Sequence, residues 1–177
     1  MSDTLLYLAI AAGLAALVLA VYYARFVLAA PRGNERMIEL SDAIRKGANA
    51  FLRREYQWVV VFVAAMAILI GVLLEDGLWR AIAYVFGAVL SGSAGLVGMR
   101  IATAANSRTA EAARSGGIAA ALPIAFRGGA VMGFTVAGLG LLGVALGYLI
   151  FVQMNPDLEL RRSAEIITAI GLGGASV

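Results

Sequence analysis

The stretch GMRIATAANSRTAEAARSGG, residues 98 to 117, places charged side chains between two long apolar segments: Arg100, Arg108, Glu111 and Arg114. Charges in such a position suit an active-site loop, a nucleic-acid surface or a connection between helices. The stretch has no aromatic side chain for stacking on bases, and alanines and one glutamate interrupt its arginines, which argues against nucleic acid. The alanine content favours a helix, in which Arg108, Glu111 and Arg114 lie along one side as mutually compensating charges.

Carboxylates in the charged connections offer a second chemistry, metal binding. The candidates are Glu35, Glu39, Asp42, Glu55 and Glu111. Magnesium sites that hold phosphate need convergent carboxylates. The first three share a helix face by their spacing, but each has a basic neighbour within one turn, which favours a solvated surface. The chain has no Cys and no His, which excludes thiolate and imidazole ligands and a histidine general base. No residue is therefore assigned a catalytic, cofactor-binding or metal-binding role.

Glycine-rich segments raise the third candidate, a phosphate-binding loop. GLGLLG (138–143) has the form GxGxxG, and GLGGAS lies near the end of the chain. The first is inside an apolar run, follows no strand and lacks a suitable acidic residue downstream, which disfavours a nucleotide site. Small residues spaced by four let helices approach closely in lipid. We therefore predict helix packing at both segments and at the pairs Gly129–Gly133 and Gly143–Gly147. We also predict it at the ridge formed by Gly87, Ser91, Gly95 and then Gly98 or Met99.

The elements that carry these residues are membrane helices. Hydrophobic residues make up 62% of the chain, compared with about 45–50% in a soluble domain. The charge-free runs 4–24, 56–74, 81–99 and 128–156 each approach or exceed the ~20 residues that a helix needs to cross the bilayer. A fifth run, 166–177, is too short to span. We interpret it as the start of a fifth helix in a fragment of a longer protein, with a re-entrant or surface segment as the alternative.

Basic residues set the orientation. One side of the predicted helices carries Arg25, Arg32, Arg36, Arg45, Lys46, Arg53, Arg54, Arg100, Arg108, Arg114 and Arg127, whereas the other side carries only Arg80, Arg161 and Arg162. The positive-inside rule places the first set in the cytoplasm and the N-terminus outside. No basic region precedes the first run, so we expect that run to stay as a membrane anchor and not to be cleaved.

Residues 34 to 51 predict an amphipathic helix, which runs along the membrane surface or straight into the second span. Asn34 is its expected N-cap, Glu35 suits the first turn, and Asp42 and Lys46 form an i,i+4 pair. A basic helix of this kind also suits anionic lipid or a partner. No Asp, Glu, Lys or Arg lies in the middle of a complete span, so the spans themselves predict a scaffold and not an ion path.

Three segments together resemble the N-terminal part of the membrane-bound inorganic pyrophosphatases that pump protons or sodium ions. They are AIRKGANAFLRREY (43–56), SGSAGLVGMRIATAANSRTAEAAR (91–114) and AFRGGAVMGFTVAGLGLLG (125–143), in the same order and spacing. The final IITAIGLGGASV (166–177) resembles the opening of that family's fifth helix. The family's catalytic motif, rich in Asp and Lys on its fifth and sixth helices, has no match here, so no functional residue is carried over.

The resemblance implies a homodimer with about sixteen transmembrane helices per subunit, of which these first four belong to an outer ring. It implies hydrolysis of pyrophosphate to two phosphates on the cytoplasmic side, with Mg²⁺ between substrate and carboxylates, and transport of a cation outward. The choice of proton or sodium ion and a requirement for K⁺ stay open. The resemblance also implies a prokaryotic plasma membrane as the location.

The sequence thus predicts an all-α, polytopic integral membrane protein, a single transmembrane fragment over residues 1–177. Its predicted helices lie at about 4–27, 56–74, 80–104 and 128–153, with the start of a fifth at 163–177 and cytoplasmic loops at about 30–55 and 105–127. Its predicted role is the scaffold of an ion-translocating pyrophosphatase, inactive by itself and with no nucleic-acid partner. The alternative is a non-enzymatic four-helix membrane scaffold, or a small transporter, complete at Val177.

Overall fold

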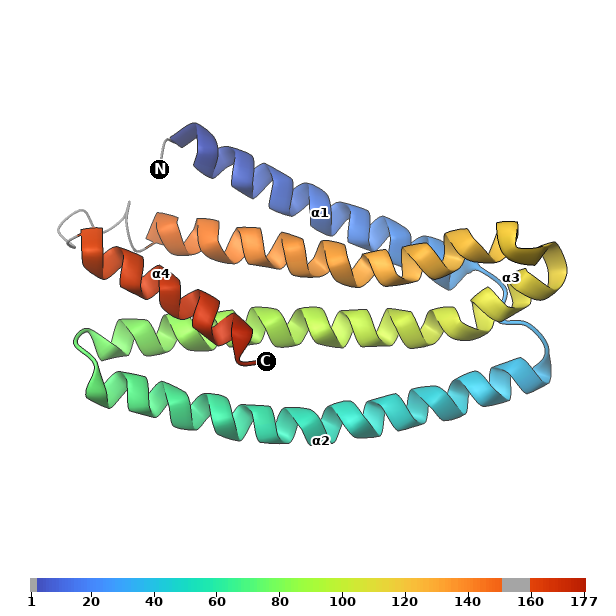
Figure 1. Cartoon of the computed structure of the whole chain (residues 1–177), viewed down its shortest axis with the longest axis horizontal. Coiled ribbons are helices and arrows are strands. Elements are labelled where there is room, and N and C mark those ends of the chain that lie inside the picture. The colour runs from blue at the N-terminus through green and yellow to red at the C-terminus, as the bar shows by residue number, and fades with distance from the viewer. Residues whose placement is uncertain (1–2, 151–159) are drawn as a thin grey trace. The chain divides into compact units, whose positions relative to one another are not determined.

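The computed structural model describes residues 3–150 and 160–177, and this part of the chain is all α-helical apart from short connections (Figure 1). Its helices are α1 (Asp3–Ala29), α2 (Glu35–Leu73), α3 (Gly77–Tyr148) and α4 (Leu160–Ala175). Three of them are long and apolar enough to cross a membrane, over Thr4–Ala29, Glu35–Leu73 and Gly77–Tyr148. The shorter α4 covers the predicted start of a fifth helix.

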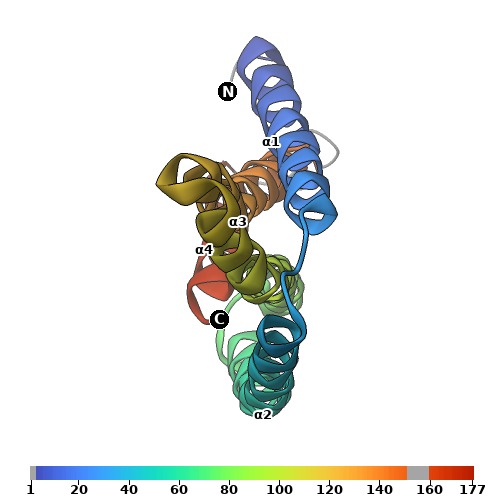
Figure 2. The same cartoon turned by 90° about the vertical axis from the view of Figure 1, so that its right-hand side faces the viewer.

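The predicted third and fourth spans both lie in α3, as two helices joined at a kink. Gly117 interrupts α3 with φ 69° and ψ −165°, a conformation that a residue with a Cβ rarely adopts. The chain reverses direction there, so α3 is a helical hairpin; Figure 2 looks onto this turn. The predicted turn near Ser115–Gly117 is confirmed. The last predicted residues of the fourth helix, 151–153, lie outside the described residues.

The amphipathic segment continues straight into the second span, which was one of the two alternatives. α2 runs without a break from Glu35 to Leu73. Asn34 is its N-cap, because the Asn34 side-chain oxygen accepts a hydrogen bond from the Met37 backbone N–H at 2.9 Å. Glu35 lies in the first turn, where its charge complements the helix dipole. Most of the predicted loop at 30–55 is therefore helix, as is most of 105–127.

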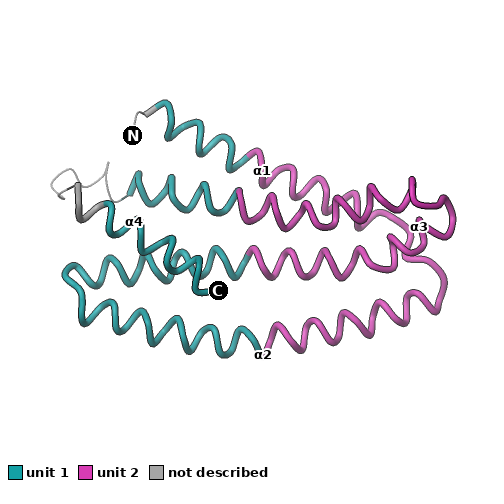
Figure 3. Tube along the Cα trace, in the orientation of Figure 1, with its two compact units in different colours: residues 1–14, 55–93, 138–177 teal, residues 15–54, 94–137 magenta. Residues whose placement is uncertain are grey.

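Contacts divide the chain into two compact units, drawn in different colours in Figure 3. Unit 1 comprises residues 1–14, 55–93 and 138–177, and unit 2 comprises residues 15–54 and 94–137. The core of unit 1 contains Ile70, Ala83, Tyr84, Ile166, Ala169 and Ile170. The core of unit 2 contains Val27, Ala105 and Ile124. Each core joins residues that are far apart in the sequence.

Glycines set the distance between α3 and α4 in unit 1. A Cβ on Gly87 would overlap the backbone of Ile170, and a Cβ on Gly173 would overlap the backbone of Tyr84. A Cβ on Gly143 would meet the side chain of Leu90, and a Cβ on Gly147 would meet that of Ile170. These contacts confirm the predicted helix packing at Gly87, at Gly143–Gly147 and at the GLGGAS segment. In lipid, such close approach supplies the dispersion contacts that hold helices together.

The pair Gly129–Gly133 in unit 2 behaves differently from the prediction. A Cβ on either glycine would have no atom of the described residues within 4 Å. Both glycines are exposed on the second half of α3, beside Phe126 (71% exposed) and Val136 (50%). Spacing alone therefore does not distinguish a glycine that contacts a neighbouring helix from one that faces outward.

The close contact at Gly173 predicts the effect of a single methyl group. Gly173→Ala should destabilise unit 1 by about 1–3 kcal/mol, because the new Cβ meets the Tyr84 backbone and no rotamer change relieves the overlap. Gly171→Ala on the same helix is the matched control, since a Cβ there has nothing within 4 Å and alanine is the better helix former. The free energy of unfolding of the purified chain, measured by denaturing-detergent titration, tests this. Equal effects of the two substitutions would contradict the assignment.

Candidate functional site

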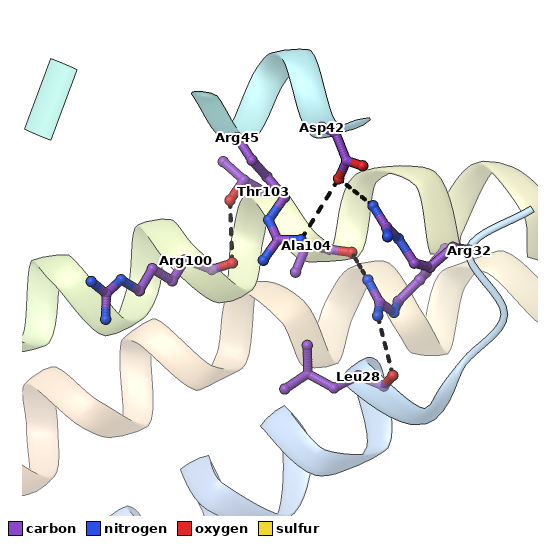
Figure 4. Close-up of polar contacts among 8 residues, drawn as sticks. Leu28, Arg32, Asp42, Arg45, Arg100, Thr103 and Ala104 are labelled. Atoms are coloured by element: carbon purple, nitrogen blue, oxygen red, sulfur yellow. Dashed lines mark hydrogen bonds and ion pairs between the residues drawn. The ribbon is translucent and has the colours of Figure 1, made fainter. Parts of the chain in front are cut away.

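Arg108 is the most deeply buried charged residue of the stretch 98–117. It lies on α3 in unit 2 and is 9% exposed. One terminal nitrogen donates to the carbonyl of Ala104 at 2.7 Å, and the other donates to the carbonyl of Leu28 at 3.2 Å (Figure 4). Leu28 is in the last turn of α1, where carbonyls lack a partner in their own helix. A cation there also complements the negative end of the helix dipole. Arg108 therefore caps α1 from another helix.

A second set of charges lies above this cap. Arg32, in the connection after α1, forms an ion pair with Asp42 of α2, and Arg45 approaches the same carboxylate at 3.8 Å (Figure 4). The predicted pairing of Asp42 with Lys46 is wrong, because within the described residues the ion-pair partners of Asp42 are Arg32 and Arg45. The connection after α1 brings the guanidinium of Arg32 to Asp42. A guanidinium binds a carboxylate better than the ammonium of Lys46 would.

Arg32, Arg45 and Arg108 form what we call the arginine cluster. Burial lowers the pKa of the Arg108 guanidinium from its usual value, and the positive charges of Arg32 and Arg45 lower it further. Arginine stays protonated in spite of such shifts. Arg32 and Arg45 share the carboxylate of Asp42, and Arg108 donates to backbone carbonyls instead. Within the described part of the chain, the buried Nε atoms of Arg32 and Arg108 have no hydrogen-bond partner.

Glu111 and Arg114 form the pair that the sequence predicts. Arg114 donates to both carboxylate oxygens of Glu111, at 2.8 and 2.7 Å. These hydrogen bonds lower the pKa of Glu111 and raise the pKa of Arg114. Arg108 does not join the pair, which corrects the expectation of three compensating charges along one side. The sequence signal that Arg108 points inward is the pair of small residues one turn before it, Ala104 and Ala105. Both alanines are buried in the structure.

Three of the five carboxylates considered as metal ligands form ion pairs with arginines. Glu39 pairs with Arg36 at 2.6 Å, Asp42 with Arg32, and Glu111 with Arg114. Across residues 3–150 and 160–177, no group of three acidic, histidine or cysteine side chains gathers to hold a metal. Within the described residues, the candidate set Glu35, Glu39, Asp42, Glu55 and Glu111 therefore does not gather into a site that fits Mg²⁺.

Arg127 makes cation–π contacts that the sequence did not predict. Its guanidinium carbon lies 3.8 Å from the centre of the Phe26 ring and 5.7 Å from that of Tyr23, and Tyr23 also packs on Phe134 at 5.8 Å. Phe26 lies near the end of the first predicted span and Arg127 near the start of the fourth. Aromatic rings and a cation at such positions are typical of a membrane–water interface.

Unit 1 has its own polar links between helices. Arg80 at the start of α3 forms an ion pair with Glu165 of α4, and the Tyr56 hydroxyl donates to the Gly92 carbonyl at 2.6 Å. The GLGLLG segment is helical throughout and does not form a loop. A Cβ on Gly13 would lie 3.1 Å from the carbonyl oxygen of Gly138, so the first glycine of that segment contacts α1. These residues thus hold helices together.

Comparison with known proteins supplies the family. Residues 14–177 match the family described as inorganic H⁺ pyrophosphatase. The chain is 38% identical over 175 residues to a K⁺-insensitive pyrophosphate-energized proton pump of Methanosarcina mazei. The aligned residues make up 99% of this chain and 26% of that protein. It is 47% identical over 126 residues to a K⁺-stimulated pyrophosphate-energized sodium pump of Thermotoga maritima, which covers 71% of this chain and 17% of that protein. The chain thus spans about a quarter or less of the length of these relatives.

The cap on α1 predicts a structural role for Arg108. Arg108→Ala should lower the free energy of unfolding by about 1–3 kcal/mol, because the part-buried hydrogen bond to the Leu28 carbonyl and the buried one to the Ala104 carbonyl are both lost. Arg114→Ala removes the same charge from an exposed position on the same helix and should leave stability nearly unchanged. Denaturing-detergent titration of both variants measures the difference. If Arg114→Ala destabilises as much as Arg108→Ala, the cap is not what Arg108 contributes.

Proposed function

Because this chain belongs to the inorganic H⁺ pyrophosphatase family, we propose that it forms the N-terminal membrane scaffold of an ion-translocating pyrophosphatase. Such a protein hydrolyses pyrophosphate to two phosphates and moves protons or sodium ions out of the cytoplasm. The observation that carries the proposal is the match over residues 14–177, together with relatives described as pyrophosphate-energized pumps. Under this proposal the chain supplies support and other parts of the protein supply the chemistry.

The polar groups inside the predicted spans support a scaffold role. The hydroxyl of Ser93 donates to the Val89 carbonyl at 2.7 Å, and that of Thr135 donates to the Val131 carbonyl at 2.7 Å. Both are bonds within one helix, so neither hydroxyl is oriented toward a neighbouring helix to relay an ion. An ion path needs ionisable or polar groups that face each other at membrane depth. The core of unit 1 instead joins its helices through apolar contacts, which include Ile70, Ala83 and Ile170.

Magnesium and potassium enter the proposal only through the family. The described carboxylates do not fit Mg²⁺. We therefore propose that the magnesium ligands lie in the part of the protein that corresponds to the remaining length of the relatives. The relatives include both K⁺-insensitive and K⁺-stimulated pumps, and the proposal leaves the K⁺ requirement to the same part. A homodimer in a prokaryotic plasma membrane completes the proposed setting.

Charge supports an orientation with the N-terminus outside. The sequence ranges of unit 2 carry all of the arginines and the lysine of the two predicted cytoplasmic connections, and their carboxylates are Glu35, Glu39, Asp42 and Glu111. The ranges of unit 1 contain Arg80, Arg161 and Arg162 with a larger number of carboxylates. Basic residues beside short loops favour the cytoplasmic side.

Single cysteines test this orientation, since the chain has none of its own. Glu75→Cys lies in the exposed connection between α2 and α3, and Ser115→Cys lies beside the turn of α3. A membrane-impermeant maleimide added to intact cells should label the first variant, and should label the second only after the membrane is permeabilised. Labelling of Ser115→Cys in intact cells, with Glu75→Cys protected, would reverse the proposed orientation.

A chimera tests the function. Residues 1–177 replace the aligned segment of the Methanosarcina mazei proton pump, and a second chimera uses the aligned segment of the Thermotoga maritima sodium pump. Each chimera should hydrolyse pyrophosphate in membrane vesicles, because the scaffold is equivalent, and each should transport the ion of the recipient. The unmodified recipients are the positive controls.

A chimera that reaches the membrane, folds and yet hydrolyses no pyrophosphate would count against the proposed role. A transported ion that changes with the graft would show that this chain, and not the rest of the protein, selects the ion.

A further inference from the structure

We propose that the arginine cluster binds a phosphate group, carried by an anionic phospholipid or present as inorganic phosphate. The cluster consists of Arg32, Arg45 and Arg108, all in unit 2. Its cytoplasmic location rests on the proposed function and orientation. The binding itself does not, and it is tested without any measurement of pyrophosphatase activity.

Charge is the first argument. Arg32 and Arg45 share the carboxylate of Asp42, and Arg108 makes its hydrogen bonds to the carbonyls of Ala104 and Leu28. Two of the three positive charges therefore lack a compensating anion within the described residues. Burying a charge without a counter-charge is unfavourable, and burial first, then the charges of Arg32 and Arg45, lower the pKa of Arg108. An added dianion or monoanion would relieve the repulsion between these arginines.

Unused hydrogen-bond donors are the second argument. A guanidinium has five N–H donors. The Nε of Arg108, a side chain that is 9% exposed, and the buried Nε of Arg32 have no partner among the residues that the structure describes. The outer parts of Arg32 and Arg45 reach solvent, with side chains 32% and 49% exposed. A ligand can thus approach from outside, where these side chains present their remaining donors.

Position and geometry favour phosphate over other anions. Guanidinium groups match the oxygens of phosphate in paired hydrogen bonds. The cluster lies at the end of α1, because Arg108 donates to the carbonyl of Leu28, the residue before the last one of that helix. Arg108 itself follows the predicted third span. In the same unit, Arg127 lies over Phe26 and Tyr23, a combination typical of the membrane interface. The phosphates of a bilayer lie at this level, and anionic lipids attract clustered arginines there.

Asp42 acts as an internal competitor. Its side chain is 45% exposed and neutralises the two arginines that a ligand would reach first. Removing its charge should therefore strengthen phosphate binding. A purely structural ion pair predicts no such gain, so this substitution separates the two roles.

Two probes test the proposal on the full chain in neutral detergent. Phosphatidylglycerol binding is measured by native mass spectrometry, with phosphatidylcholine as the neutral reference, and inorganic phosphate binding is measured by calorimetry. We expect saturable binding of at least one probe at a single site. Arg32→Gln should weaken it about tenfold, the effect of losing one charged hydrogen bond, and Asp42→Asn should strengthen it.

Arg36→Gln is the matched control. It removes the same charge from a nearby position in the first turn of α2, but Arg36 is 70% exposed and pairs with Glu39. Its affinity should stay within about twofold of the unmodified chain, since exposed charges act weakly through solvent. Arg45→Gln changes a second, half-exposed member of the cluster and should weaken binding as Arg32→Gln does.

The outcomes separate the sources and the alternatives. Binding of phosphatidylglycerol alone identifies the lipid headgroup as the source, and binding of inorganic phosphate identifies the free ion. The proposal is overturned if neither probe binds, if Arg32→Gln and Arg36→Gln weaken binding equally, or if Asp42→Asn weakens it.

Discussion

Helices surrounded by lipid gain nothing from burying one apolar side chain against another, since the lipid is equally apolar. What remains is close approach of backbones and satisfaction of every buried polar group. Unit 1 meets the first requirement at Gly87 and Gly173, where α3 and α4 leave no room for a methyl group. Unit 2 meets the second requirement at Arg108, which supplies a hydrogen-bond partner for a carbonyl at the end of α1. Many large apolar side chains, such as Val72 at 76% exposure, face outward.

The charges follow from the same constraint. Ionisable side chains are absent from the middle of the predicted spans and gather in the connections, where water or an opposite charge is within reach. There they form defined contacts, of which the Glu111–Arg114 pair is balanced and the arginine cluster is not. This imbalance is what makes the cluster suited to an external anion. A scaffold can therefore carry a ligand site without taking part in the catalytic reaction.

Local patterns in the sequence predicted local features well. Run lengths located the spanning segments, Asn34 was identified as a cap from its residue type, and the glycines near residue 117 located the reversal of α3. Contacts across long separations were missed: Arg108 reaches Leu28 across 80 positions, and Arg80 reaches Glu165 across 85. Spacing on one helix cannot show that a side chain points to another helix. For the same reason, spacing could not show that Gly87 packs closely on another helix whereas Gly129 does not.

We propose that this chain supports an ion-translocating pyrophosphatase but carries no part of its catalytic site. The family match and the helix packing support the first half of this proposal. The ion pairs of Glu39, Asp42 and Glu111 with arginines support the second half. The most direct measurement is phosphate release from magnesium pyrophosphate by purified residues 1–177 in lipid vesicles. The account predicts release no faster than in protein-free vesicles. Turnover above that background, abolished by heat denaturation, would contradict it.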